Sequence, residues 1–289
     1  MAVSGEELLR ICKTENIPIY EYSIRREMSF GKSREVIFSR MKKRLEVMKS
    51  AAEYGVDSIS TSVGGLIGGE AFRINKYIKT GNTILGNTIL KAMCRAFSCA
   101  EVNASMGKIV AAPTAGSCGI IPAALITAAE SCDKGEEAII HGLFTAGEVG
   151  AIISQNATVA GAEGGCQAEC GSAAAMAAAA LVEMMGGSPE ASLHAAGMAL
   201  QNVMGLICDP IAGLVESPCS KRNASGVVNA LCSAEMALAG VASIIPFDEV
   251  VEAMYRVGKN MPAEHRETAL GGIAATPTGN KYKKDIMGS

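Results

Sequence analysis

Cysteine is the residue type in this sequence that offers the most chemistry, and the chain of 289 residues contains ten of them. One group sits in segments interrupted by glycine and proline: Cys118, Cys166, Cys170, Cys208 and Cys219. The other group sits in helical or apolar surroundings, where a free cysteine usually behaves as a small hydrophobe: Cys12, Cys94, Cys99, Cys132 and Cys232. Irregular backbone near a thiolate points N–H groups at sulfur and lets the chain wrap around an inorganic group, so the first group is the candidate for chemistry.

The segment ICDPIAGLVESPC, residues 207–219, raises the main question. Cys208 and Cys219 stand eleven positions apart, with Pro210 two residues after the first and Pro218 directly before the second. The two thiols could be disulfide partners, core filler, nucleophiles or metal ligands. Ten cysteines in a reducing compartment argue against a disulfide framework and leave metal binding, catalysis and simple burial open.

The spacing of the cysteines narrows the metal alternatives. No pair of cysteines has the C-x₂-C spacing that zinc ribbons and ferredoxin-type electron carriers use. Cys166 and Cys170 are four residues apart and would share one face of a helix. On the residues alone, a metal cluster and buried structural cysteines both remain open.

Other catalytic patterns are weak. The histidines His141, His194 and His265 are scattered and lack a metal-like partner, which is typical of structural histidines. The glycine pairs in TSVGGLIGGEAF, residues 61–72, do not form a phosphate-binding loop, because GK[ST] is missing and no strand-like run precedes them. They indicate close packing or a turn. No G-x-S-x-G elbow occurs, and the lysines lie mostly in charged stretches that do not support a pyridoxal-phosphate site.

The composition favours helices and excludes several classes of protein. Hydrophobic residues make up 49% of the chain and aromatic residues 4%, so the apolar content is mostly Ala, Met, Ile, Val and Leu, as in closely packed helices. The net charge is −3, and Lys42-Lys43-Arg44 is the one basic cluster, so nucleic-acid binding is not supported. The N-terminal sequence lacks the apolar core of a secretory signal. The most apolar run, residues 174–186, carries Glu183 and is too short to span a bilayer. We therefore expect a cytoplasmic protein that contacts neither a membrane nor nucleic acid.

Helical periodicity predicts the elements that must position these residues. In residues 33–54 the positions Ile37, Met41, Leu45, Met48 and Ala52 fall on one helical face, with Ser33 as N-cap and Gly55 as the end. Between residues 90 and 205 Ala-rich stretches alternate with Gly, Ser and Thr clusters, which favours helices that approach closely.

The predicted fold class is therefore mainly α, a single compact bundle of closely packed Ala/Gly-rich helices with a loop region around the cysteines. Strand evidence is thin, because the short runs at 108–112 and 242–247 are ambiguous. We expect residues 1–55 to form an N-terminal helical segment and residues 56–289 to form the main domain.

Four segments together resemble a known family. Residues 112–123 (APTAGSCGIIPA), 161–181 (GAEGGCQAECGSAAAMAAAAL), 208–223 (CDPIAGLVESPCSKRN) and 271–279 (GGIAATPTG) closely resemble the α chain of the iron–sulfur L-serine dehydratases. The resemblance runs from about Ser33 to the C-terminus, with the motifs long and in order.

The resemblance implies a cofactor and its ligands. In that family three cysteines hold a [4Fe–4S] cluster and leave one iron without a protein ligand, and the matching positions here are Cys166, Cys208 and Cys219. The family pattern does not make Cys118 and Cys170 ligands, so they are expected to support the site or to pack. The open iron would act as a Lewis acid for the hydroxyl leaving group of L-serine, which yields pyruvate and ammonia without pyridoxal phosphate. Residues 56–289 would then be the catalytic, cluster-binding helical domain.

The same resemblance suggests substrate-binding residues. Arg222 and Asn223 match the family's R-N and either bind the substrate carboxylate or brace the cluster loop. Thr114 and Ser117 lie in a turn suited to hydrogen-bonding a small polar substrate. Pro210 is expected, with Pro218, to stop a helix beside each ligand so that the chain can turn.

The catalytic base stays open. Its candidates are Ser62, Ser117 and His141. Glu163 could orient a ligand or act as an acid or base, but a buried structural carboxylate is an equal alternative.

The resemblance also implies a partner and leaves rival functions. Longer single-chain members carry a regulatory-like domain and a C-terminal cysteine tail, whereas this chain ends KKDIMGS. It therefore looks like the α chain of the two-chain type, expected to form a hetero-oligomer with a β chain. The rivals are a related cluster-dependent cysteine desulfidase, a non-catalytic iron–sulfur protein with a fully ligated cluster, and an Ala-rich helical domain with incidental buried cysteines.

Overall fold

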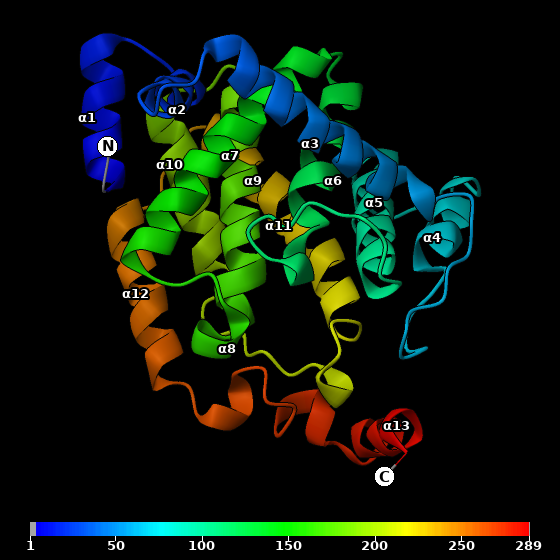
Figure 1. Ribbon diagram of the computed structural model, residues 1–289. Coiled ribbons are helices and arrows are strands. Elements are labelled where there is room, and N and C mark those ends of the chain that lie inside the picture. Colours follow the sequence, from blue (N-terminus) through cyan, green and yellow to red (C-terminus); the bar gives the residue numbers. More distant parts are fainter. Residues whose placement is uncertain (1–3, 289) are drawn as a thin grey trace.

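The computed structural model describes residues 4–288, and these form a helical bundle (Figure 1). The α-helices are α1 (Gly5–Glu15), α2 (Ile19–Met28), α3 (Arg34–Tyr54), α4 (Glu70–Ile78), α5 (Gly86–Ala104), α6 (Ile120–Ser131), α7 (Glu136–Asn156), α8 (Gly161–Gly164), α9 (Ser172–Met184), α10 (Pro189–Gln201), α11 (Cys219–Leu238), α12 (Phe247–Asn260) and α13 (Pro277–Met287). Short helical turns join them: η1 (Ala115–Ser117), η2 (Gln167–Gly171), η3 (Ile211–Gly213), η4 (Ala263–His265) and η5 (Gly272–Ala275). Within residues 4–288 the sole β pairing is an isolated bridge between Cys208 and Arg266. The mainly α prediction is confirmed, and neither ambiguous run is a strand.

Helix α9 is the centre of the bundle. It packs against α6, α7, α10 and α11, and Figure 1 shows it surrounded by them. Its residues 173–175 and 177–180 are alanines that are almost completely buried. Alanine lets neighbouring helices approach closely, and a glycine does the same on α7: a Cβ at Gly150 would lie 2.6 Å from the Met176 side chain. Such tight packing leaves little room for larger side chains.

Helix α3 follows its sequence signals. The Ser33 side chain accepts a hydrogen bond from the Val36 N–H, and Gly55 is the C-cap, as predicted. Ile37, Leu45, Met48 and Ala52 are buried, and Met41 packs partly buried against the core.

The N-terminal helices share the main core. Leu8 of α1 and both Ile19 and Ile24 of α2 are fully buried in the same hydrophobic cluster as α9. The division of the chain at residue 55 remains a prediction, and its first residues, 1–3, lie outside the described ones.

The start of α2 is held by a side chain from α9. Its N-cap, Pro18, makes no side-chain capping bond. Instead the N–H groups of Ile19 and Tyr20 donate to the Glu183 carboxylate at 2.5 and 3.1 Å, and the Thr145 hydroxyl donates to it as well. A carboxylate at a helix N-terminus satisfies free N–H groups and complements the helix dipole. None of the described helices combines the length and apolarity that crossing a membrane requires.

Glu183→Ala tests this cap. The substitution leaves the Ile19 and Tyr20 N–H groups and the Thr145 hydroxyl without their acceptor, so we expect the free energy of unfolding to fall by about 2–4 kcal/mol. Urea denaturation measures it. Glu252→Ala, which removes an exposed carboxylate paired with Arg256, should change the stability by less than about 0.5 kcal/mol. Equal effects of the two substitutions would contradict the capping role.

Candidate metal centre

Two separate parts of the chain, one with Cys166 and one with Cys208 and Cys219, come together at one site. Cys166 directly precedes the π-helical turn η2, Cys208 lies in the segment after α10, and Cys219 is the first residue of α11. Burial raises the pKa of the Cys219 thiol to about 12, and burial raises that of Cys208 as well. The negative charge of Cys166 raises the pKa of both thiols further, so the three cysteines interact electrostatically.

A fourth thiol, Cys170, joins this group from the other end of η2. It is fully buried and shares a hydrogen bond with Cys166. That bond, and then the charge of Arg222, hold the pKa of Cys166 below its usual value despite burial. All ten cysteines are free, so Cys208 and Cys219 are not disulfide partners.

The remaining cysteines lie elsewhere. Cys118 contacts the Cys99 carbonyl at 3.7 Å in a small apolar cluster, so it packs away from the thiol site. Cys12, Cys94 and Cys99 are buried, as expected for small hydrophobes. Cys132 and Cys232 are exposed, which corrects that expectation for these two, because both lie on the outer surface of the bundle.

The backbone of Cys208 is fixed by the segment after α12. The Cys208 N–H donates to the His265 carbonyl at 2.9 Å, and the Glu267 N–H donates to the Cys208 carbonyl at 2.8 Å. This pairing brings the Glu267 carboxylate to the site. Glu169, Cys208 and Glu267 each offer a ligand atom, and these atoms lie within 4.8 Å of one another. Glu169 itself is 3.9 Å from the Cys208 sulfur, and burial raises its pKa.

A buried ion pair closes the loop between Cys208 and Cys219. Arg222 donates to the Asp209 carboxylate at 2.7 Å and to the Ile207 carbonyl at 2.9 Å. The second oxygen of Asp209 accepts from the Ile273 N–H at 2.7 Å. Gly272 makes this approach possible, because a Cβ there would lie 2.1 Å from that carboxylate oxygen.

Asn223 braces the neighbouring turn. Its amide group donates to the carbonyls of Gly116 and Cys219 at 2.7 and 2.9 Å, and its oxygen accepts from the Gly119 N–H at 2.9 Å. Both amide hydrogens are therefore used inside the protein. This geometry favours the bracing alternative for Asn223.

The turn at Thr114 and Ser117 lies beside Glu169. The two hydroxyls are 3.1 Å apart, and a hydrogen bond from Thr114 lowers the pKa of Glu169 against the larger effect of burial. A Cβ at Gly116 would lie 3.4 Å from the Glu169 carboxylate. The structure thus brings this turn next to the thiols through Glu169.

Two other predicted residues lie outside this constellation. Ser62 donates to Glu216 at 2.6 Å, and Glu216 also accepts from the N–H groups of Gly64 and Leu66, so the glycine-rich segment is a turn anchored on the loop that carries Cys219. His141 stacks on Tyr20 with ring centroids 4.0 Å apart, in the first part of α7, and is not among the contacts of the thiols.

Two local expectations are wrong. Glu163 is exposed on α8, so it is not a buried carboxylate. Pro210 precedes η3 and Pro218 is the N-cap of α11, so each proline stands before a helical element and neither stops one. Proline is tolerated there because the first N–H groups of a helix need no partner within it.

Sequence reasoning missed Glu169 and Glu267. Glu169 stands between the two cysteines of CQAEC, and that position was a usable signal. Glu267 reaches the site only through the backbone pairing with Cys208, which no local pattern predicts.

The residues present fit an iron–sulfur cluster. Thiolates are the ligands that such clusters take, and the three cysteines here lie outside regular helix interiors, with Cys166 and Cys208 buried and Cys219 partly buried. Gly161 faces the same space: a Cβ there would lie 2.6 Å from the Glu169 carboxylate and 3.1 Å from the Cys208 sulfur. The positive charge of Arg222 beside Cys166 suits a negatively charged group.

Comparison with known proteins agrees with the motifs. A family model described as serine dehydratase alpha chain matches residues 14–274. The chain belongs to the serine dehydratase alpha chain family. A probable L-serine dehydratase alpha chain of Bacillus subtilis is 49% identical over 284 residues, which cover 98% of this chain and 94% of that protein. The L-serine dehydratase alpha chain of Peptoniphilus asaccharolyticus is 49% identical over 288 residues, 99% of each chain.

Longer members of the serine dehydratase family also match. An L-serine dehydratase of Mycobacterium tuberculosis is 36% identical over 282 residues, which cover 94% of this chain and 60% of that protein. The family expected from the cysteine-bearing motifs is thus confirmed along nearly the whole chain.

Arg222→Met tests the ion pair that closes the cysteine loop. The substitution leaves the buried Asp209 carboxylate without its cation, so we expect the free energy of unfolding to fall by about 3 kcal/mol or more. Adding Asp209→Asn should recover part of the loss, because the unpaired charge is then gone. Chemical denaturation measures both.

Arg256→Met is the matched control, since Arg256 forms an exposed pair with Glu252 on α12. We expect a change below about 0.5 kcal/mol. A loss for Arg222→Met no larger than that of the control would show that the pair does not hold the loop.

Proposed function

We propose that this chain is the α chain of an L-serine ammonia-lyase that converts L-serine to pyruvate and ammonia. The observation that supports the proposal most directly is the electrostatic interaction of Cys166, Cys208 and Cys219, of which Cys166 and Cys208 are buried and Cys219 is partly buried. The names of the 49% identical relatives support the substrate. In this proposal the three thiolates hold a [4Fe–4S] cluster.

When bound, a cluster with one iron free of protein ligands supplies a Lewis acid for the hydroxyl leaving group. Residues of the chain itself set the charge around the cluster ligands. Arg222 offsets the negative charge of the Cys166 thiolate, and its contacts with Asp209 and Ile207 keep it in place. Burial of Cys166 and Cys208 removes bulk water around them, which strengthens these electrostatic interactions.

Substrate contacts are assigned to the turn at Thr114 and Ser117, whose hydroxyls can hydrogen-bond a small polar molecule. Arg222 has five N–H donors, and Ile207, Asp209 and Cys166 take three of them, so it retains donors for a carboxylate. Asn223 is assigned to holding the turn against Cys219 instead of contacting the substrate directly.

Among the candidates for the base, Ser117 has the best support. Its hydroxyl lies 3.1 Å from that of Thr114, which in turn contacts Glu169 beside Cys208. Ser62 donates its hydrogen bond to Glu216, and His141 stacks on Tyr20. Ser117 would therefore need to pass its proton through Thr114 toward Glu169.

The proposal includes a β chain as partner in a hetero-oligomer, because both relatives that are 49% identical carry alpha chain in their names. A cytoplasmic location is part of the same proposal.

Cys208→Ser tests the cluster. Anaerobically purified wild-type protein should contain about four irons with matching acid-labile sulfide, as a [4Fe–4S] cluster requires. The variant should lose most of both, because one ligand is gone. Cys232→Ser, which changes an exposed cysteine on α11, should retain the wild-type iron content. Iron-free wild-type protein would contradict the assignment.

Turnover by the same preparations, with the partner chain present, separates the rival activities. Pyruvate from L-serine supports the lyase. Sulfide release from L-cysteine without pyruvate from L-serine would favour a desulfidase and overturn the proposed substrate.

A further inference from the structure

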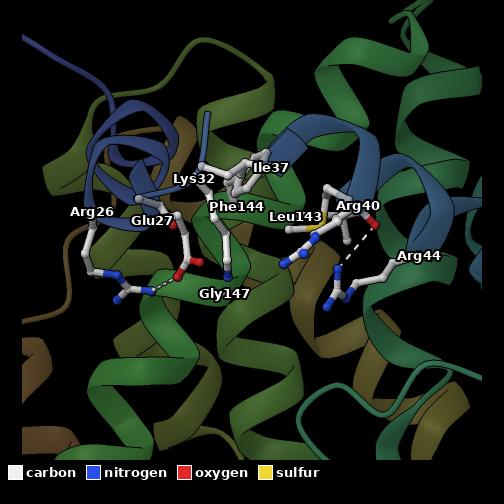
Figure 2. A pocket seen from close by; sticks show the side chains of 11 residues that line it. Arg26, Glu27, Lys32, Ile37, Arg40, Arg44, Leu143, Phe144 and Gly147 are labelled. Atoms are coloured by element: carbon white, nitrogen blue, oxygen red, sulfur yellow. Dashed lines mark hydrogen bonds and ion pairs between the residues drawn. The ribbon is translucent and has the colours of Figure 1, made fainter. Parts of the chain in front are cut away.

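A basic cavity of about 260 Å³ lies between α2, α3 and α7, apart from the thiol site. Four cationic side chains line it: Arg26, Lys32, Arg40 and Arg44. Figure 2 shows Lys32 reaching into the cavity from one side and Arg40 from the other, above the α7 backbone at Gly147. The chain as a whole has a net charge of −3, so this local excess of positive charge is not a consequence of composition.

Most of these cations lack a carboxylate partner. Arg26 pairs with the buried Glu148 at 2.8 Å and with Glu27 at 3.5 Å, and among the described residues Glu27 is the acidic one that lines the cavity. Among residues 4–288 no ion pair is formed by Lys32, Arg40 or Arg44. Arg44 donates to the Arg40 carbonyl at 3.2 Å, which holds its guanidinium near the rim. Like charges held together repel, and a bound anion relieves that repulsion.

The cavity also has an apolar wall and an open floor. Ile37, Leu143 and Phe144 are buried side chains that line it, beside the partly buried Met41. Gly147 is exposed, and a Cβ there would meet nothing within 4 Å, so space stands above the helix backbone. The cavity thus combines guanidinium and ammonium donors with a hydrophobic surface.

We propose that this cavity binds a small phosphate monoester, with the phosphate between Lys32 and Arg40 and a short apolar group against Phe144. Guanidinium groups match the geometry of phosphate oxygens. The four cations exceed the two carboxylates, Glu27 and Glu148, by two positive charges, and a phosphate monoester carries two negative charges that neutralise them. A ligand there contacts α2, α3 and α7 together. This site does not depend on the proposed function.

Isothermal titration calorimetry of the full-length protein tests the site, in a buffer of low ionic strength without phosphate or sulfate. The probes are phenyl phosphate, inorganic phosphate and benzoate. We expect saturable one-to-one binding of phenyl phosphate, weaker binding of inorganic phosphate, which lacks the apolar group, and weaker binding of benzoate, which has a single charge. Benzoate binding as tightly as phenyl phosphate would overturn the phosphate assignment.

Variants then locate the site. Arg40→Gln should weaken phenyl phosphate binding by about tenfold or more, the usual effect of losing one charge-assisted hydrogen bond. Gly147→Met should block binding by filling the open floor, where the added Cβ meets no atom within 4 Å. Arg10→Gln, an exposed arginine on α1, is the control and should bind as the wild type does. Absence of saturable binding to the wild type, or equal affinities for Arg40→Gln and Arg10→Gln, would overturn the proposal.

Discussion

The arrangement of the thiols depends on the buried ion pair between Asp209 and Arg222. Asp209 directly follows Cys208, and Arg222 comes three residues after Cys219, so the pair fixes both ends of the loop that carries the two cysteines. Asp209 also accepts from the Ile273 N–H, which ties the C-terminal segment to the same point. A buried charge without its partner is costly, so each member of the pair requires the other.

The segments around the cysteines lie at one end of the helical bundle. Figure 1 shows α8, the start of α11 and the segment after α12 at the same end, below the Ala-rich centre formed by α9. Gln167 of η2 connects its own turn to α8, to α12 and to the segment after α10: its amide donates to the carbonyls of Gly164 and Met254 and accepts from the Gly205 N–H. The irregular backbone around Cys166 is therefore held by a buried side chain with all these partners satisfied.

Sequence patterns predicted what depends on local periodicity and on long motifs. The amphipathic spacing of α3 and its Ser33 cap were correct, as was the mainly α class. The motifs around Cys166, Cys208 and Cys219 identified the family, while the role of these three residues as cluster ligands stays a prediction. Sequence patterns could not predict Glu267 at the site, because it joins the site through a backbone pairing between segments almost sixty residues apart. The role of Asn223 needed coordinates too, since its partners Gly116 and Gly119 lie more than a hundred residues away.

In the proposed reaction, L-serine binds an iron of the cluster that the protein leaves free. Mössbauer spectroscopy of the anaerobically purified, ⁵⁷Fe-enriched protein with its partner chain, recorded with and without L-serine, tests it most directly. If three irons are held by Cys166, Cys208 and Cys219, L-serine should change the signal of one iron site of the cluster and leave the others nearly unchanged. Identical spectra with and without L-serine would contradict it and would indicate a fully ligated, non-catalytic cluster.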